Sequence, residues 1–246
     1  MARSSRLRKT PRRSDRPVRR AHPTARPRPA AVTIPVTPGY LEIVLATRNP
    51  GKVREFLELM RDLPLQVYSL DAFPQIEALS EEGITYTENA ISKAGTVARL
   101  TGRVTVADDS GIEIDALEGG PGPQSARFLG DQTSDAARNA RILRLLHNVS
   151  AERRTARYRT VVAVAHPEGE VRTFEGTCEG RIATAPRGSG GFGYDPVFMV
   201  PAYGKTMAQL PLALKNRISH RARAFTAARP YLKALAAGRP SLDGDS

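Results

Sequence analysis

The sequence of 246 residues has little cysteine, little lysine and no long apolar run. Cys178 is the single cysteine, which excludes an intramolecular disulfide and argues against a metal cluster held by thiolates. This usage suits a reducing compartment, and we expect a cytoplasmic protein. No apolar run approaches the roughly 18 residues that a membrane-spanning helix needs, so we expect a soluble chain with no membrane partner. The hydrophobic fraction of 40% is enough to bury a core.

The sequence also lacks an even distribution of basic residues, although the net charge is +12. Residues 1–40 carry ten arginines and Lys9 against Asp15 alone, and residues 41–246 are nearly neutral. Because aliphatic residues are sparse there, we predict a disordered Arg/Pro-rich extension at 1–40, a folded domain at 41–240 and a flexible end at 241–246. Binding of nucleic acid and an organelle address stay open for the extension, but we favour an extension without a specific role.

The remaining chain alternates apolar runs with helical periodicity, which predicts an α/β domain. Residues 41–46 form an apolar run that ends in a turn, and apolar positions at helical spacing follow over 52–61. A turn between a strand and a helix favours a bound anion. The other predicted elements are helices at 87–100, 135–147 and from His220 onward, and strands at 104–107, 158–165 and 170–183.

The first candidate site is this turn, which consists of Thr47, Arg48, Asn49, Pro50, Gly51 and Lys52. Gly51 permits close approach of a ligand to the backbone, Thr47 and Asn49 can donate hydrogen bonds, and Lys52 supplies a compact positive charge for phosphate. The spacing of an ordinary P-loop is absent. An ordinary capped turn with an exposed lysine is the alternative. Only six lysines accompany 31 arginines, which suggests that Lys52 is kept for its shape.

The second candidate site is Asp108-Asp109, which we place in a turn directly after the strand at 104–107. Adjacent carboxylates repel each other unless a cation or a proton intervenes, and their oxygens suit Mg²⁺. A solvated acidic turn is the alternative. Glu81 offers a further carboxylate for the metal, or belongs to a surface acidic pair with Glu82. Lys93 either reaches the acidic turn or only flanks its helix.

The third candidate site could recognise a nucleobase and comprises Phe192, Gly193, Tyr194, Asp195, Lys215, His220 and Arg221. An aromatic ring can stack on a base, and Asp195 can accept hydrogen bonds from base nitrogens. Lys215, His220 and Arg221 can donate to exocyclic oxygens, which favours a 6-keto purine over adenine. The alternative is that the aromatic residues belong to the core and that His220 and Arg221 only begin a helix.

Taken together, these segments resemble the inosine/xanthosine triphosphate pyrophosphatase family across about residues 41–237. The matching stretches, in family order, are residues 46–52, 88–90 with 93–94, 107–111, 121–122 with 125–127, 190–196, 205–206, and 215–216 with 218–221. Each stretch alone is a weak signal, whereas the ordered set is highly specific.

The resemblance implies an elongated α/β fold of the inosine triphosphatase (Maf/Ham) type, with a central mixed twisted sheet flanked by helices. It implies hydrolysis of non-standard purine nucleoside triphosphates (ITP, dITP, XTP) to the monophosphate and pyrophosphate, and a homodimer. Asp109, Lys52 and Asp108 are then the catalytic residues, Asp109 being the general base, and Glu81 and Asp109 hold Mg²⁺. The implied substrate contacts are Thr47, Arg48, Asn49, Pro50, Gly51, Lys52, Ser110, Phe192, Gly193, Tyr194, Asp195, Lys215, His220 and Arg221.

The sequence departs from the family pattern at three places. Arg48 stands where a small or polar residue is usual, and it could tighten or crowd phosphate binding. Gln209 replaces a usual Glu, and the apolar residues 212–214 precede Lys215 where polar residues are common. These departures bear on substrate preference and efficiency.

Two other functions stay open at this point. A phosphomonoesterase could use Asp108 and Asp109, although such enzymes usually need an Asp-x-Asp arrangement. A nucleic-acid-binding protein would depend on residues 1–40, and that activity could coexist with the first.

Overall fold

The structure is a computed structural model that describes residues 39–77, 79 and 83–238. Residues 1–38 of the predicted extension, the predicted flexible end at 241–246, and Glu81 and Glu82 lie outside the described residues. Within the described ranges, no helix is both long and apolar enough to cross a membrane.

The described strands form one mixed sheet, in agreement with the predicted fold class. The spatial order is β2-β1-β3-β5-β6-β7-β8, with β4 paired to β3. β1 pairs in parallel with β2 and β3, and the other pairs are antiparallel. The strands are β1 (Leu41–Leu45), β2 (Leu65–Ser69), β3 (Val104–Ile114), β4 (Pro121–Gly122), β5 (Thr155–Ala165), β6 (Val171–Ile182), β7 (Phe198–Val200) and β8 (Lys205–Thr206).

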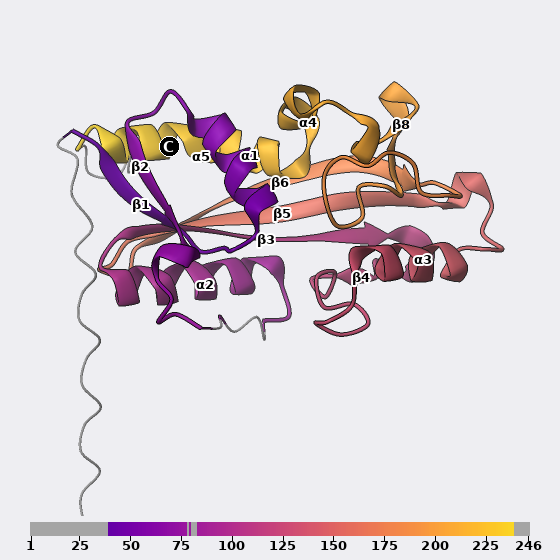
Figure 1. The fold of residues 1–246 in the computed structure, drawn as a ribbon, viewed down its shortest axis with the longest axis horizontal. Helices are drawn as coiled ribbons and strands as arrows, with labels where there is room; N and C mark the ends of the chain where they lie inside the picture. The colour runs from indigo at the N-terminus through magenta and orange to yellow at the C-terminus, as the bar shows by residue number, and fades with distance from the viewer. Residues whose placement is uncertain (1–38, 78, 80–82, 239–246) are drawn as a thin grey trace, which may run out of the picture. The chain divides into compact units, whose positions relative to one another are not determined.

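Helices pack on both faces of this sheet (Figure 1). They are α1 (Pro50–Met60), α2 (Tyr86–Thr101), α3 (Asp135–Leu145), α4 (Leu212–Ile218) and α5 (His220–Ala236), with short 3-10 turns between elements. α1 and α5 cover one face through Phe56 and Phe225, whose rings meet edge to face with centroids 5.1 Å apart. α2 covers the opposite face, and α3 packs at the other end of the long strands around Ile112 and Ile114.

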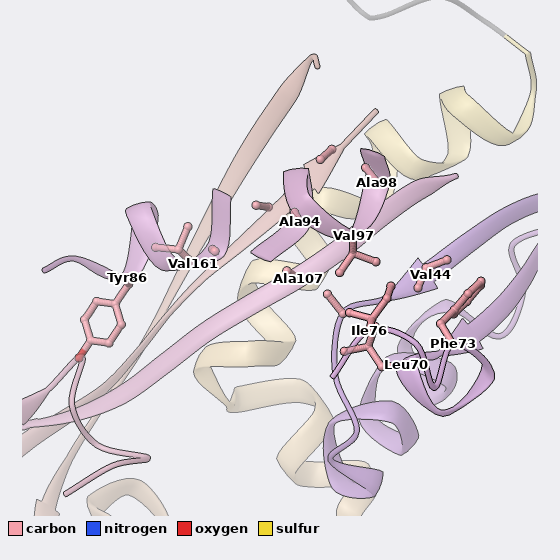
Figure 2. Packing of buried hydrophobic residues seen from close by; sticks show 14 residues of the cluster. Val44, Leu70, Phe73, Ile76, Tyr86, Ala94, Val97, Ala98, Ala107 and Val161 are labelled. Carbon is pink, nitrogen blue, oxygen red and sulfur yellow. The ribbon is translucent and has the colours of Figure 1, made fainter. Parts of the chain in front are cut away.

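Small side chains bring α2 close to the sheet. Figure 2 shows Ala94, Val97 and Ala98 of α2 packed towards Val44 and Ala107 of the strands, and all five side chains are buried. Because alanine adds little volume, the helix axis approaches the strands closely, and dense packing fixes it there. The polar residues of α2 that face the same way are therefore held against β3.

The predicted strand at 104–107 is too short, and the acidic turn predicted after it is wrong. β3 continues through both aspartates to Ile114 and pairs with β5 from Thr105↔Ala165 to Ile114↔Ala156. Its pairing with β1 ends at Val106, and its pairing with β4 begins at Ile112. Among the described strands, none covers this edge of β3 between those points. The aspartates therefore lie on a rigid strand beside an open edge.

Caps in the sequence set the beginnings of the helices close to the predicted positions. Asn49 caps α1, Ser134 caps α3 and Ser219 caps α5. The elements that the sequence analysis did not predict are short: β2, β4, β7, β8 and α4.

Candidate active site

A cleft of about 260 Å³ opens beside the exposed edge of β3. Lys52 and Asp109 both line it, so the predicted phosphate turn and the predicted acidic site meet in one place. The lining residues are Asn49, Lys52, Asp109, Ser110, Gly111, Ser125, Ala126, Asp135, Arg138, Tyr158, Phe192, Gly193, Tyr194, Asp195, Lys215, His220 and Arg221.

The turn before α1 places Lys52 at one end of this cleft. Asn49 Oδ1 accepts hydrogen bonds from Gly51 N at 2.8 Å and Lys52 N at 3.2 Å, and Thr47 Oγ1 accepts from Asn49 N at 3.1 Å. These bonds fix the first turn of the helix, with Pro50 at its first position. A Cβ on Gly51 would lie 2.7 Å from Phe192 Cδ1, so glycine lets the segment around Phe192 lie directly on this turn.

Arg48 points away from the cleft. Its guanidinium donates to the carbonyl oxygens of Ile76 and Glu77, the latter at 3.1 Å. Arg48 thus ties the turn to the segment that follows β2, and its guanidinium does not crowd Lys52.

Asp108 faces α1 and α5, where it is held by two cations. Its Oδ2 atom lies 2.9 Å from Lys52 Nζ and 3.1 Å from Arg221 Nε, and it accepts from Ser110 Oγ at 2.7 Å. Burial by itself would raise the pKa of Asp108, but attraction by Lys52, Arg221 and Lys93 holds this pKa well below its usual range. Asp108 thus stays ionised and holds the ammonium group of Lys52 in place.

Asp109 faces the opposite side, towards α2. Its Oδ1 atom lies 3.2 Å from Lys93 Nζ, and its Oδ2 atom accepts from Asn89 Nδ2 at 3.0 Å. Lys93 also donates to the Asp108 carbonyl oxygen at 2.9 Å. Of the two interpretations of Lys93, the structure supports the one in which it reaches the acidic residues.

The two carboxylates therefore leave the strand in opposite directions, as successive side chains of a strand do. Asp109 lines the cleft, and Asp108 lies behind Lys52. Two such carboxylates do not converge on one phosphorus, so the geometry does not favour the phosphomonoesterase.

The other end of the cleft is formed by the segment after β6 and by α4 and α5. Asp195 is 3% exposed and accepts from Lys215 Nζ at 2.7 Å, Tyr158 OH at 3.2 Å and Phe192 N at 3.1 Å. The Phe192 ring lies over two cations, with Lys215 Nζ at 4.8 Å and Arg221 Cζ at 5.2 Å from its centroid. Asp195 thus binds neighbouring protein groups, while Phe192 presents an aromatic face.

His220 begins α5 and stacks on Tyr158, with ring centroids 4.6 Å apart. Its Nδ1 atom is buried and has no hydrogen-bond partner among the described residues. Burial, followed by the charges of Arg221 and Lys215, lowers the pKa of His220 well below its usual value. A neutral imidazole with an unpaired nitrogen therefore faces the cleft.

Glu55 is a residue of this site that the sequence analysis missed. It is 3% exposed, and its carboxylate lies 2.9 Å from Lys215 Nζ and 2.7 Å from Arg221 Nη1. Burial would raise the pKa of Glu55, but Arg221 and Lys215 lower it. The available signal was its position three residues after Lys52, on the same face of α1.

The departure at Gln209 has a local explanation. Gln209 Oε1 accepts from Thr206 N at 2.9 Å and closes a capping box, a bond that a carboxylate would also make. The apolar residues 212–214 form the first turn of α4, and Leu212 there is 41% exposed. Neither departure removes a group from the cleft lining.

In the described part of the chain, no three His, Cys, Asp or Glu side chains group closely enough to hold a metal ion. Mg²⁺, however, is often bound by one or two carboxylates and completes its shell with water and substrate phosphates. Asp109 is a carboxylate of this kind in the cleft. Glu81, its predicted partner, lies outside the described residues.

Comparison with known proteins places this cleft in context. The model of the Ham1 family matches residues 43–231. The dITP/XTP pyrophosphatase of Desulforamulus reducens is 48% identical over 195 residues, covering 79% of this chain and 97% of that protein. The dITP/XTP pyrophosphatase of Nitratidesulfovibrio vulgaris is 52% identical over 189 residues, covering 74% and 91%.

Solved structures of similar proteins have the same fold as this chain. A HAM1 protein from Coxiella burnetii superposes with a TM-score of 0.72 at 40% identity and covers 78% of this chain and 98% of its own. A nucleoside-triphosphatase / dITP/XTP pyrophosphatase from Mycobacterium abscessus superposes with a TM-score of 0.63 at 38% identity, covering 77% and 100%.

Proposed function

The chain belongs to the Ham1 family, and on that premise we propose that it hydrolyses non-standard purine nucleoside triphosphates (ITP, dITP, XTP) to the monophosphate and pyrophosphate. The observation that carries this proposal is a single cleft lined by the ammonium of Lys52, the carboxylate of Asp109 and the aromatic ring of Phe192. These groups suit a substrate that has both a polyphosphate and a base.

At the phosphate end, Lys52 would neutralise the triphosphate. Burial lowers the pKa of Lys52, partly offset by the attraction of Asp108 at 2.9 Å. Asp108 thus keeps the ammonium in place, and a fixed cation stabilises charge on phosphate without reorganisation.

Asp109 would orient the attacking water. The ion pair with Lys93 and the hydrogen bond from Asn89 fix the carboxylate, so its position relative to the α phosphorus is set by α2. A lone carboxylate is a weak base, and most of the rate would come from positioning and charge neutralisation. In-line attack at the α phosphorus releases pyrophosphate.

Asp109 and Glu81 would hold Mg²⁺ together with triphosphate oxygens. The ion would supply Lewis-acid neutralisation of the phosphate charge. The oxygen-only donor set at Asp109 fits such a hard cation.

At the base end, Phe192 would stack on the purine, while Lys215 and the unpaired Nδ1 of neutral His220 would face its exocyclic groups. The ammonium of Lys215 is a donor, so a 6-keto group finds a partner there and the 6-amino group of adenine does not. A mispaired buried polar group discriminates strongly.

A panel of nucleotides with product identification tests the proposal. We expect Mg²⁺-dependent release of pyrophosphate from ITP, dITP and XTP, and at least about 100-fold lower kcat/KM with ATP, whose 6-amino group meets a donor. Orthophosphate as the first product would refute cleavage between the α and β phosphates. Assembly into a homodimer and a cytoplasmic location are also proposals, and sedimentation and fractionation would test them.

A further inference from the structure

The segment that carries Phe192 is held by single hydrogen bonds, among them Arg187 N to Pro196 O at 2.8 Å, Gly190 N to Ala208 O at 3.0 Å and Phe192 N to Asp195 Oδ2 at 3.1 Å. No helix or strand lies between β6 and β7, and residues 184–191 are all exposed. Gly188, Gly191 and Gly193 have φ values of 79°, 76° and 60°. Since glycine has the largest backbone freedom of any residue, this segment depends on bonds to other elements for its conformation.

Helix α3 supplies these bonds at the end of the segment nearest the cleft. Gly193 N donates to Asp135 Oδ2 at 2.7 Å, and Gly193 O accepts from Asn139 Nδ2 at 3.0 Å. Both backbone groups of one glycine are thus held by two side chains one helical turn apart. Phe192 and Tyr194 flank Gly193. The Phe192 ring is therefore held by these two bonds together with the bond from Phe192 N to Asp195 Oδ2 at 3.1 Å, and the Tyr194 ring also by its hydroxyl, which donates to Ser125 O at 2.8 Å.

Asp135 and Asn139 are themselves firmly placed, and we call the two residues the α3 latch. Asn139 is 4% exposed, and Arg138 Nη1 lies 3.3 Å from the second oxygen of Asp135. Arg138 in turn donates to the carbonyl oxygens of Phe128 at 3.0 Å and Gly130 at 3.1 Å. Through Arg138, Asp135 is therefore tied to the chain that precedes α3.

There is space into which the segment could relax without the latch. A groove of about 670 Å³ lies between α3 and residues 186–196, and Asn139 lines this groove rather than the cleft. Asn139 is therefore placed to act on the cleft through Gly193, and not by touching a substrate.

We infer that Asp135 and Asn139 are positioning residues, which hold Gly193 so that the Phe192 ring stays against Lys215 and Arg221 at the base end of the cleft. The inference rests on the proposed function in that the base is the group stacked on Phe192. Since the latch acts through Gly193 on the Phe192 ring, its loss weakens substrate binding and leaves the chemical step at Asp109 nearly unchanged.

The first test reads the segment directly and needs no substrate. The sequence contains no tryptophan, so Phe192→Trp introduces a single fluorescent reporter. Adding Asn139→Leu, which keeps the volume and removes the donor, should lower the steady-state anisotropy of this reporter and raise its quenching by acrylamide. Adding Arg141→Ala, an exposed residue of the same helix, should change neither.

The second test is kinetic and uses dITP with the full chain. Loss of a hydrogen bond predicts that Asn139→Leu raises KM about tenfold while kcat stays within about twofold. In a Phe192→Ala background the same change should raise KM by less than about twofold, because the group that it positions is gone.

Unchanged anisotropy in the Asn139→Leu reporter would overturn the inference. A full tenfold rise of KM in the Phe192→Ala background would also overturn it, because the effect would then be a general one on stability. If dITP is not hydrolysed but the anisotropy falls, the latch stands and the proposed function fails. Should Asn139→Leu not fold, Asn139→Asp serves in its place, since it keeps the shape of the side chain and removes the donor to the Gly193 carbonyl oxygen at 3.0 Å.

Discussion

The two faces of β3 carry neighbouring aspartates in contrasting surroundings. On the face of α1 and α5, Asp108 is held between Lys52 and Arg221 and lies behind the cleft. On the face of α2, Asp109 meets Lys93 and Asn89 and lines the cleft. An aspartate on one face therefore holds two cations behind the cleft, and an aspartate on the other face, paired with Lys93, lines the cleft. The neighbourhood, and not the residue type, separates the two roles.

The largest expected effect tests whether only Asp109 performs chemistry. Asp109→Asn should lower kcat about 1000-fold, because the amide does not accept a proton from water. The fold should survive, since Lys93 keeps its bond to the Asp108 carbonyl oxygen at 2.9 Å. Pyrophosphate release and circular dichroism measure the two properties. Activity within tenfold of the wild type would reverse the assignment of roles.

The second effect tests whether Asp108 is the anchor. Asp108→Asn leaves Lys52 and Arg221 without their shared anion, which should reduce the free energy of unfolding by about 3 kcal/mol. For Asp109→Asn we expect about 2 kcal/mol, because one buried cation, Lys93, loses its carboxylate and keeps its bond to the Asp108 carbonyl oxygen. Urea denaturation of both variants gives the comparison, and equal losses would show that the two faces do not differ in this way.

A third effect extends the comparison along the face of Asp108. Glu55→Gln removes the anion shared by Lys215 and Arg221 and should raise KM for dITP about 30-fold, near 2 kcal/mol. Glu58→Gln on the same helix is the matched control, because Glu58 is an exposed residue paired only locally with Arg61 at 3.0 Å. Equal kinetics for the two variants would remove Glu55 from the site.

The smallest expected effect is a dependence of the free energy of unfolding on pH, caused by His220 at the start of α5. The pKa of His220 is lowered well below its usual value of 6.5, so the unfolded chain takes up a proton below that pH and the folded chain does not. Stability therefore falls as the pH falls. Between pH 7.5 and 5.5 the wild type should lose about 1.4 kcal/mol more than His220→Gln in urea denaturation. Parallel pH profiles would argue against a buried neutral imidazole.

Much of the fold follows from local patterns in the sequence. The helices predicted at 52–61, at 135–147 and from His220 begin in the structure at the caps Asn49, Ser134 and Ser219, and such starts are predictable because capping depends on neighbouring residues alone. The short strands β4, β7 and β8 have two or three residues, too few to show an alternating pattern.

The site was harder to predict where partners are distant in the chain. The sequence placed Asp108 and Asp109 in a turn, because two adjacent carboxylates suit solvent better than a strand. The strand continues since Asp108 pairs with Arg221, 113 positions away, and because the side chains alternate in direction. Glu55 and the outward direction of Arg48 depend on similar distant contacts, and the local pattern offers only the position of Glu55 three residues after Lys52.

The cleft beside the open edge of β3 is lined by two kinds of structure, a long paired strand and a segment without helix or strand. Asp109, the proposed hydrolytic group, stands on a long paired strand, whereas Phe192, the ring proposed to stack on the base, stands on a glycine-rich segment bonded to α3. Tolerance to substitution should follow this division. A library of variants restricted to residues 186–193 and the exposed face of α3 should change which nucleotide is accepted. Asp109 on the strand would stay unchanged in every variant.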